Sequence, residues 1–196
     1  MIDATDQELL ARFAAGDGRA FDDIVTKYER RVFSIALRMC GDREDARDVT
    51  QDVFVNAMRA LKRFRGDAQL GTWFHRVATN ASLDHLRKNR KRVHRPIDEV
   101  TEVATSEPGP DDRALGSARA AAVQEALRQL SPDHRAAMVL VDIHGLDYAE
   151  AAESLGIPVG TVKSRMHRAR LEMAKMLGHL RETEPSGPPT PLREEP

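Results

Sequence analysis

The sequence predicts an all-α protein made of two small helical domains. Charged residues make up 31% and aromatic residues only 5% of the 196 residues, a composition that favours a mostly helical chain. Apolar residues recur at steps of three and four in two regions, as in amphipathic helices. Between these regions, Pro, Gly, Ser, Thr and acidic residues follow one another without periodicity, which indicates a flexible acidic linker. The expected boundaries are 1–92 for the first domain, 93–116 for the linker, 117–180 for the second domain and 181–196 for a disordered tail.

Two helices are expected at the start of the first domain. Thr5 and Glu8 have the spacing of a capping box, which begins a short helix. Gly16 and Gly18 then break that helix. A longer helix follows, because apolar residues keep helical spacing from residue 21 to residue 39.

A third and a fourth helix complete the first domain. Asp42 can cap the third helix. Its expected buried stripe is Val49, Val53, Ala57, Leu61 and Phe64. Gly66 and Gly71 bracket a loop, FRGDAQLGT, and the fourth helix is expected from about Trp73 into the basic run LRKNRKR.

The second domain is expected to begin with a helix through Val123, Leu127 and Leu130. Ser131 and Pro132 then supply a cap and a first-turn proline for a second helix. That helix is expected to run to Gly145 and to lead directly into the most informative stretch of the chain.

Residues 147–170, DYAEAAESLGIPVGTVKSRMHRAR, predict two short helices joined by a tight turn. Asp147 can cap the first helix, and Glu150 completes a capping box. Gly156 can adopt the positive φ that a tight helix exit needs, and Pro158 prevents the first helix from continuing. The second helix then begins near Val159. This pattern is typical of a helix-turn-helix.

The second helix of this pair has one apolar stripe and one basic face. The stripe consists of Val162, Met166, Ala169 and Met173. The other face carries Thr161, Lys163, Ser164, Arg165, His167, Arg168 and Arg170. Such a face suits a DNA major groove, where Arg donors match guanine edges and Ser, Thr and Lys reach bases or phosphates. A solvated face on an ordinary helical hairpin is the alternative; the small Ala pair, the Gly turn and the scarcity of acidic residues favour DNA binding.

The charge distribution predicts two kinds of partner. The formal net charge is −1, whereas autonomous DNA-binding domains are usually basic because phosphate contacts supply most of their affinity. Basic residues crowd positions 87–95 and 163–170, and acidic residues crowd positions 42–52 and 98–112. This asymmetry indicates a nucleic acid and a basic protein surface.

The third and fourth helices carry the candidate contacts of the first domain. Asp48, Gln51 and Asp52 form a compact acidic patch on the outer face of the third helix, which serves either as a solubilising face or as a docking site for an Arg-rich partner. On the fourth helix, Arg and Lys can hold phosphates, Asn can read a base edge and an aromatic ring can support an unstacked base. The candidates are Trp73, Arg76, Asn80, Arg87 and Lys88, with Trp73 alternatively a core anchor and the basic run alternatively a nuclear-type address or an RNA arm.

Three segments resemble those of the extracytoplasmic-function (ECF) sigma factors, small bacterial sigma factors with only the σ2 and σ4 domains. These segments are DVTQDVF, TWFHRVATN and PVGTVKSRMHRAR, in the order of the family. The resemblance runs from about Asp6 to Leu180 and omits only the linker and the tail. It implies a σ2-like helical bundle and a σ4-like helix-turn-helix domain.

The resemblance also implies partners and roles. Asp48, Gln51 and Asp52 match positions that dock on the β′ clamp coiled coil of core RNA polymerase, and the σ4 domain is expected to meet the β flap. The loop from Phe64 to Thr72, which contains Arg65, together with Trp73, Arg76 and Asn80 matches positions that open the −10 element and capture a flipped base. Arg87 and Lys88 are expected to add contacts to the −10 DNA. An anti-sigma factor is expected as a further partner.

On the recognition helix, the matching positions make Lys163, Ser164, His167 and Arg168 the expected readers of base edges in the −35 element. Tyr148, Pro158, Gly160 and Thr161 are expected along the phosphates. Arg165 is expected either to contact DNA or to brace the fold. The identity of the residue at the position of His167 varies within the family, so its base preference is specific to this chain.

Other classes of function find less support in the sequence. The seven histidines form no HExxH or Cys/His metal spacing, and no Walker, Rossmann or nucleophile-elbow pattern appears, so we expect no enzyme activity, no cofactor and no metal. Cys40 is the only cysteine and is expected in the core. No long apolar run or signal peptide is present, which predicts a cytoplasmic protein without membrane insertion. A free-standing helix-turn-helix regulator is the alternative to a sigma factor, but it has no reason to carry DVTQDVF and TWFHRVATN.

Overall fold

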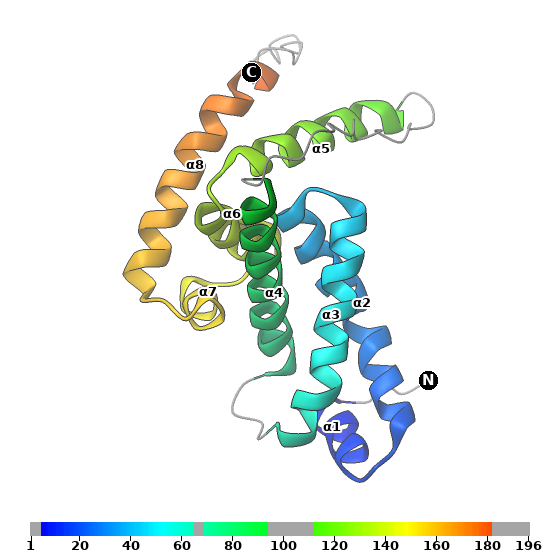
Figure 1. Cartoon of the computed structure of the whole chain (residues 1–196). Coiled ribbons are helices and arrows are strands. Elements are labelled where there is room, and N and C mark those ends of the chain that lie inside the picture. Colours follow the sequence, from blue (N-terminus) through cyan, green and yellow to red (C-terminus); the bar gives the residue numbers. More distant parts are fainter. Residues whose placement is uncertain (1–4, 65–68, 94–111, 182–196) are drawn as a thin grey trace, which may run out of the picture.

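The computed structural model describes residues 5–64, 69–93 and 112–181, and within these ranges all regular structure is helical. The helices of the first domain are α1 (Asp6–Ala14), α2 (Gly18–Cys40), α3 (Arg43–Ala60), the 3₁₀ turn η1 (Leu61–Arg63) and α4 (Leu70–Val93). Figure 1 shows α2, α3 and α4 side by side, with α1 across the end near the N-terminus.

Side-chain capping explains where α1 and α3 begin. Thr5 and Glu8 form the expected capping box of α1, and Asp42 accepts hydrogen bonds from the backbone N–H groups of Glu44 and Asp45 at the start of α3. Gly41 ends α2 with φ +77°, a conformation that costs a residue with a Cβ about 1–2 kcal/mol. The chain can therefore reverse direction sharply between α2 and α3.

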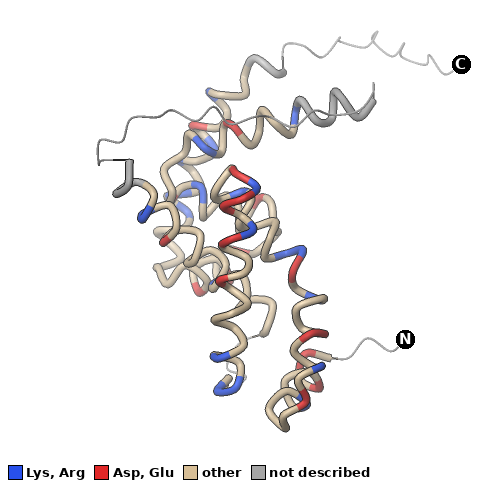
Figure 2. Tube along the Cα trace, turned by 45° about the vertical axis from the view of Figure 1, so that its right-hand side comes forward, with Lys and Arg blue, Asp and Glu red and all other residues tan. Residues whose placement is uncertain are grey.

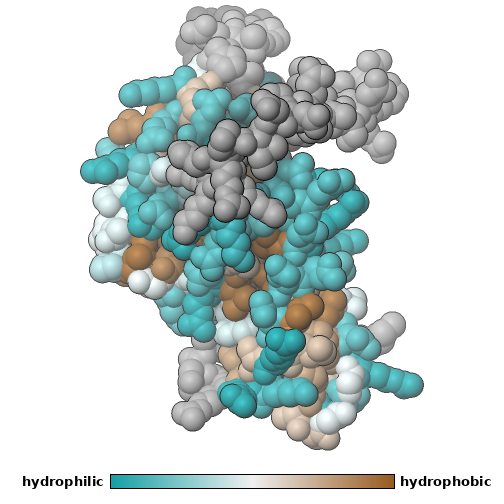
Figure 3. All heavy atoms as spheres, viewed as in Figure 1, coloured by the Kyte–Doolittle hydropathy of each residue, from teal (hydrophilic) through white to brown (hydrophobic). Residues whose placement is uncertain are grey.

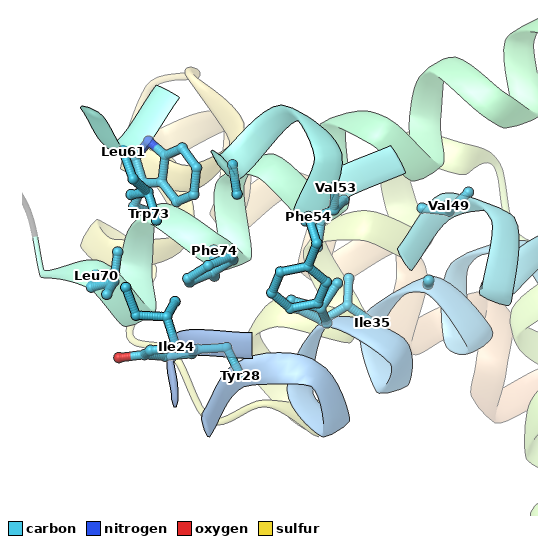
Figure 4. Close-up of a cluster of buried hydrophobic side chains, with 14 of the residues drawn as sticks. Ile24, Tyr28, Ile35, Val49, Val53, Phe54, Leu61, Leu70, Trp73 and Phe74 are labelled. Carbon is cyan, nitrogen blue, oxygen red and sulfur yellow. The ribbon is translucent and has the colours of Figure 1, made fainter. Parts of the chain in front are cut away.

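An aromatic cluster forms the centre of the first core (Figure 4). Phe74 is fully buried and stacks on Tyr28 with a distance of 4.6 Å between ring centroids. Phe54 and Trp73 approach the same ring at 5.5 and 5.0 Å. Because each buried aromatic side chain contributes roughly 1.5–3 kcal/mol, this cluster is a main source of stability for α2, α3 and α4.

The second domain contains α5 (Asp112–Gln129), α6 (Pro132–Met138), the π-helical turn η2 (Val139–Ile143), α7 (Tyr148–Leu155) and α8 (Val159–Arg181). The expected caps are present: Ser131 with Pro132 begins α6, and Asp147 with Glu150 begins α7 as a capping box. Gly156 adopts φ +65° at the end of α7, as expected. The second core contains Leu127, Leu130, Leu140 and the buried stripe of α8.

The two domains pack against each other. Helix α7 lies against α4, and α5 and α6 reach the end of α2 (Figure 1). Ala136 and Val139 belong to the first core rather than to the second. At the centre of this junction, the buried guanidinium of Arg135 donates to the carbonyl oxygen of Met39 and to those of Arg128 and Leu130. One side chain therefore joins the ends of α2 and α5.

Several expected boundaries are wrong. Helix α4 begins at Leu70 rather than near Trp73, so Gly71 lies inside the helix and not in the loop. Helix α5 begins at Asp112, inside the expected linker, because an Ala- and Arg-rich sequence supports a helix that Gly116 does not interrupt. Arg181 ends α8 instead of starting the tail. The rest of the expected linker and tail, 94–111 and 182–196, lies outside the described residues.

Replacing Arg135 with Met should lower the free energy of unfolding by about 2–3 kcal/mol, because buried carbonyl groups at two helix ends lose their donor. Urea denaturation followed by far-UV circular dichroism measures this change. Arg128→Met is the matched control, since the Arg128 side chain is 52% exposed, and should change stability by no more than about 0.5 kcal/mol. Equal losses in the two variants would contradict the proposed importance of Arg135.

Candidate functional site: nucleic-acid and polymerase faces

Helix α8 separates a buried stripe from an exposed basic face, as expected. Val162, Met166 and Ala169 are buried in the second core. Lys163, Ser164, His167 and Arg168 are exposed, although the Ser164 hydroxyl also donates to the carbonyl oxygen of Thr161 at 2.9 Å. The four expected base readers therefore share one solvent-facing side of the recognition helix.

Two arginines of α8 are held by carboxylates of the same domain. Arg165 donates to Asp133 of α6 at 3.0 Å, and its side chain is only 23% exposed. Arg170 makes a two-pronged contact with Asp142 of η2 at 2.6 and 3.1 Å. The pairing with Asp133 fits the bracing role expected for Arg165, and a contact of Arg165 with DNA stays a prediction.

The start of α8 offers free backbone donors to a phosphate. The carbonyl oxygen of Pro158 accepts from the N–H groups of Thr161 and Val162, while the first N–H groups of any helix have no partner within the helix. Gly160 is exposed, and a Cβ at this position would meet no atom within 4 Å. Anions bind readily at such helix ends. Tyr148 is half-buried at the start of α7.

Arg76, Asn80 and Arg87 lie along one face of α4, at spacings of four and seven residues, and all three are exposed. Arg87 pairs with Asp84 on the same helix at 2.9 Å. Lys88 is exposed on the next face around the helix. A strand of DNA that follows this face would meet two cations and one amide, which suits backbone contact together with reading of a base edge.

Two aromatic residues flank the loop that was expected between the third and fourth helices: Trp73 is buried, as its alternative role of core anchor requires, whereas Phe64, expected in the buried stripe of the third helix, is only half-buried. Trp73 is only 8% exposed and packs edge-on against Phe64 and Phe74. Phe64 is half-buried, and Arg65 lies outside the described residues. The ring of Trp73 therefore anchors the start of α4 to the core, and a base would meet mainly its edge.

A basic hollow that the sequence analysis missed lies at the end of α3 and in η1. Asn56, Arg59, Lys62 and Arg63 line this cavity of about 490 Å³. Figure 2 shows these basic residues at one end of α3 and acidic residues nearer its other end. The signal was present in the sequence, because Arg59, Lys62 and Arg63 recur at steps of three and one before the loop.

The acidic patch of α3 is fully accessible. Asp48, Gln51 and Asp52 are exposed, and within the described part of the chain none of them pairs with another side chain. Asp42 and Asp45, by contrast, have structural roles: Asp42 caps α3, and Asp45 contacts His85 of α4 at 2.9 Å. The later carboxylates are thus available to a partner.

The acidic patch continues into an apolar stretch that the sequence analysis also missed. Val55 is 43% and Met58 is 45% exposed, and they lie about two and about three turns beyond Asp48 on the same side of α3. Figure 3 shows hydrophobic atoms over the lower part of this helix. Spacing of seven and ten residues from Asp48 was the signal that could have identified them. Charged and apolar groups side by side are typical of a protein-binding surface.

An apolar groove opens on the second domain. A cavity of about 280 Å³ lies between α5, η2 and α8, lined by Val123, Leu127, Met138, Asp142, Ile143, Arg170 and Met173. Ile143 is 38% exposed there. The groove therefore exposes apolar surface that the second core does not cover.

Two further observations concern chemistry and membranes. Among the described residues, no group of three or more His, Cys, Asp or Glu side chains could hold a metal ion, and no helix is long and apolar enough to cross a bilayer. Cys40 is buried at the end of α2, and burial raises the pKa of its thiol to about 12, so the thiol stays protonated at neutral pH.

Two family models match separate parts of the chain, one in each helical domain. Residues 24–92 match the family model for sigma-70 region 2, and residues 120–173 match that for sigma-70 region 4. The ECF RNA polymerase sigma factor SigM of Mycobacterium tuberculosis is 40% identical over 90% of this chain and 86% of its own length. The RNA polymerase sigma-H factor of Pseudomonas aeruginosa is 37% identical over 88% of this chain and 93% of its own length.

A solved structure shares the fold. CnrH, in complex with the cytosolic domain of CnrY, superposes with a TM-score of 0.64 and 30% identity, over 89% of this chain and 97% of that chain. The chain therefore belongs to the ECF sigma factors of the sigma-70 family. It is a sigma factor, the kind of protein that directs core RNA polymerase to promoters, and not a free-standing regulator.

Arg168→Ala should weaken promoter binding by the assembled holoenzyme by about 1–3 kcal/mol through loss of a contact in the −35 element. Arg165→Ala should change DNA affinity far less and should cost only about 0.2–1 kcal/mol of stability, because it removes a partly exposed pair with Asp133. Fluorescence anisotropy with labelled −35 DNA, together with thermal melting, measures both quantities. Equal losses of affinity would place Arg165 on the DNA.

Proposed function

We propose that this sigma factor docks on the β′ clamp coiled coil of core RNA polymerase through the outer face of α3. The observation that carries the proposal is the exposed set Asp48, Gln51 and Asp52, without side-chain partners among the described residues, beside the exposed apolar residues Val55 and Met58. Carboxylates supply charge complementarity to a basic partner, and the apolar residues supply the desolvated centre that gives interfaces most of their affinity.

The start of α4 and the hollow beside it are the proposed −10 surface. Arg76 and Asn80 are exposed near the start of α4, and Arg59, Lys62 and Arg63 line the hollow at the end of α3 and in η1. Unstacking and unpairing of bases costs a few kcal/mol, least at flexible TA steps. Phosphate contacts in the hollow would hold the single strand, and Asn80 would hydrogen-bond an extruded base. Phe64 would support that base, with Trp73 behind it and Arg87 and Lys88 on upstream phosphates.

Helix α8 is the proposed reader of the −35 element. Lys163, Ser164, His167 and Arg168 would face base edges in the major groove, while Thr161 and the backbone of Pro158 and Gly160 would lie along phosphates, with Tyr148 beside them. The support is their shared exposure on one side of a helix whose opposite stripe is buried. A helix with this arrangement enters the groove with its first turns.

Two further partners are proposed, the β flap of core polymerase and an anti-sigma factor. The apolar groove between α5, η2 and α8 is the proposed site for the β flap, because it is a hydrophobic hollow on the second domain away from the base-reading residues. Structures of relatives in complex with other proteins, such as CnrH with CnrY and the sigma factor RpoE with the anti-sigma factor NepR from Bartonella quintana, support an anti-sigma factor as a regulator. We expect the protein to act in the cytoplasm as a specificity subunit without enzyme activity of its own.

Run-off transcription with purified core polymerase tests polymerase docking. Wild-type protein should yield discrete transcripts from pooled promoter fragments. The triple variant Asp48→Arg, Gln51→Ala, Asp52→Arg should yield almost none, because like charges would meet across the interface. In the same assay, Ile143→Asp should reduce the transcripts if the β flap occupies the apolar groove.

The matched control is the double variant Asp22→Arg, Glu29→Arg, which changes net charge by the same amount on an exposed face of α2. It should keep wild-type activity. Loss of transcription in the control to the same extent would show that overall charge, not the α3 face, decides docking. Specific DNA binding by the protein alone, without stimulation of core polymerase, would contradict the proposed docking on core polymerase.

The role of α4 in melting can be separated from recognition. Arg76→Ala and Asn80→Ala should each reduce open-complex formation about 5- to 150-fold on duplex promoters, because each removes about 1–3 kcal/mol of contact to the opened strand. Templates with a mismatched, already opened −10 region should restore much of the activity. Permanganate footprinting reports the opened bases. An equal defect on duplex and mismatched templates would argue against a role in opening.

A further inference from the structure

Two histidines from different domains meet at the junction. His75 lies on α4 of the first domain, and His144 caps the π-helical turn η2 of the second. Their rings lie 5.8 Å apart between centroids, tilted by 56°. The two side chains therefore form a direct contact between the domains, outside every surface assigned above.

Neither imidazole is satisfied in this contact. His75 is only 7% exposed, and neither of its ring nitrogens has a hydrogen-bond partner among the described residues; the same holds for Nε2 of His144. Other histidines of the chain do have carboxylate partners, as in the pairs of His85 with Asp45 and of His134 with Glu172. A buried polar group without a partner costs about 1–3 kcal/mol.

The surroundings of the pair are cationic. The positive charge of Arg31 on α2 lowers the pKa of both imidazoles, and that of Arg38 on the same helix lowers the pKa of His144. On α7, the carboxylate-bearing Glu153 lines a small pocket with Thr72, Trp73 and Arg76 at the start of α4. Two imidazoles beside guanidinium groups also make a poor metal site, which would need more ligands and fewer cations.

These surroundings make proton uptake and domain packing compete. Burial, and then the charge of Arg31, lower the pKa of His75 to about 4, and burial together with Arg31 and Arg38 lowers that of His144. An exposed histidine has a pKa of about 6.5. Because the packed state has the lower pKa, its stability is full above about pH 6.5 and falls as the pH drops from there towards 4.

We propose that His75 and His144 act as a pH-sensitive latch that holds the two domains together while both imidazoles are neutral and releases them when either takes up a proton from solvent. The junction contains a further buried polar group that lacks a hydrogen-bond partner among the described residues, the hydroxyl of Ser154 on α7. Release of the two domains would uncover the start of α4 around Trp73 and Arg76, which α7 now contacts. The importance of this uncovering for −10 DNA rests on the proposed function.

Small-angle X-ray scattering of the full chain, without polymerase or DNA, tests the latch. Between about pH 7.5 and pH 5.5, the ratio of open to packed molecules should rise about tenfold from His75 alone, given an open-state pKa near 6.5. The radius of gyration should increase while far-UV circular dichroism shows unchanged helix content. In the double variant His75→Gln, His144→Gln, the radius of gyration should not respond to pH in this window.

His85→Gln is the matched control, because it removes a histidine of the same helix whose ring pairs with Asp45 of the first domain; it should keep the wild-type response. If the double variant loses helix content, His144→Gln alone takes its place and should show a smaller response than wild type. The proposal is overturned if wild type does not expand, if it expands only with loss of helix, or if the glutamine variant expands equally. Because no polymerase is present, these outcomes are independent of the proposed promoter contacts.

Discussion

The buried guanidinium of Arg135 fixes how the two halves of this protein meet. It donates to carbonyl oxygens at the ends of α2 and α5, where the last carbonyl groups of a helix have no partner and carry the negative end of its dipole. Arg135 itself lies on α6, which leads through η2 into the helix-turn-helix. Its hydrogen bonds therefore set the position of α7 against α4, and with it the side on which the recognition helix emerges.

On each functional helix, one face packs into a core and the opposite face is exposed to a partner. On α3, Val49, Val53 and Ala57 are buried while Asp48 and Asp52 are exposed. On α8, the buried stripe orients the basic face, and the pairing of Arg165 with Asp133 holds the helix against α6. Burial of the apolar stripe supplies most of the stability of each helix, so its exposed face can carry charges that serve a partner.

Features that depend on neighbouring residues could be predicted from the sequence, whereas contacts between residues far apart in the chain could not. The capping boxes of α1 and α7 and the positive φ of Gly156 depend on neighbours within a few residues, so the sequence alone predicts them. The contacts of Arg135 with Met39 and of Arg165 with Asp133 join residues far apart in the chain. No periodicity reveals such contacts. The burial of Trp73 and the exposure of Val55 likewise depend on which helix covers which face.

The packed junction and the spacing of promoter elements make opposing demands. Elements centred near −35 and −10 lie about 85 Å apart on straight B-DNA, at 3.4 Å per base pair. Helix α8, with 23 residues, is only about 35 Å long, and in the packed arrangement the helix-turn-helix stands beside α4. If α4 and α8 read these two elements together, the contacts of Arg135 and His75 must break first. Binding to core polymerase must then supply more free energy than the junction contributes. Imidazole nitrogens and a buried hydroxyl without hydrogen-bond partners in the described part of the chain weaken the junction and so lower that requirement.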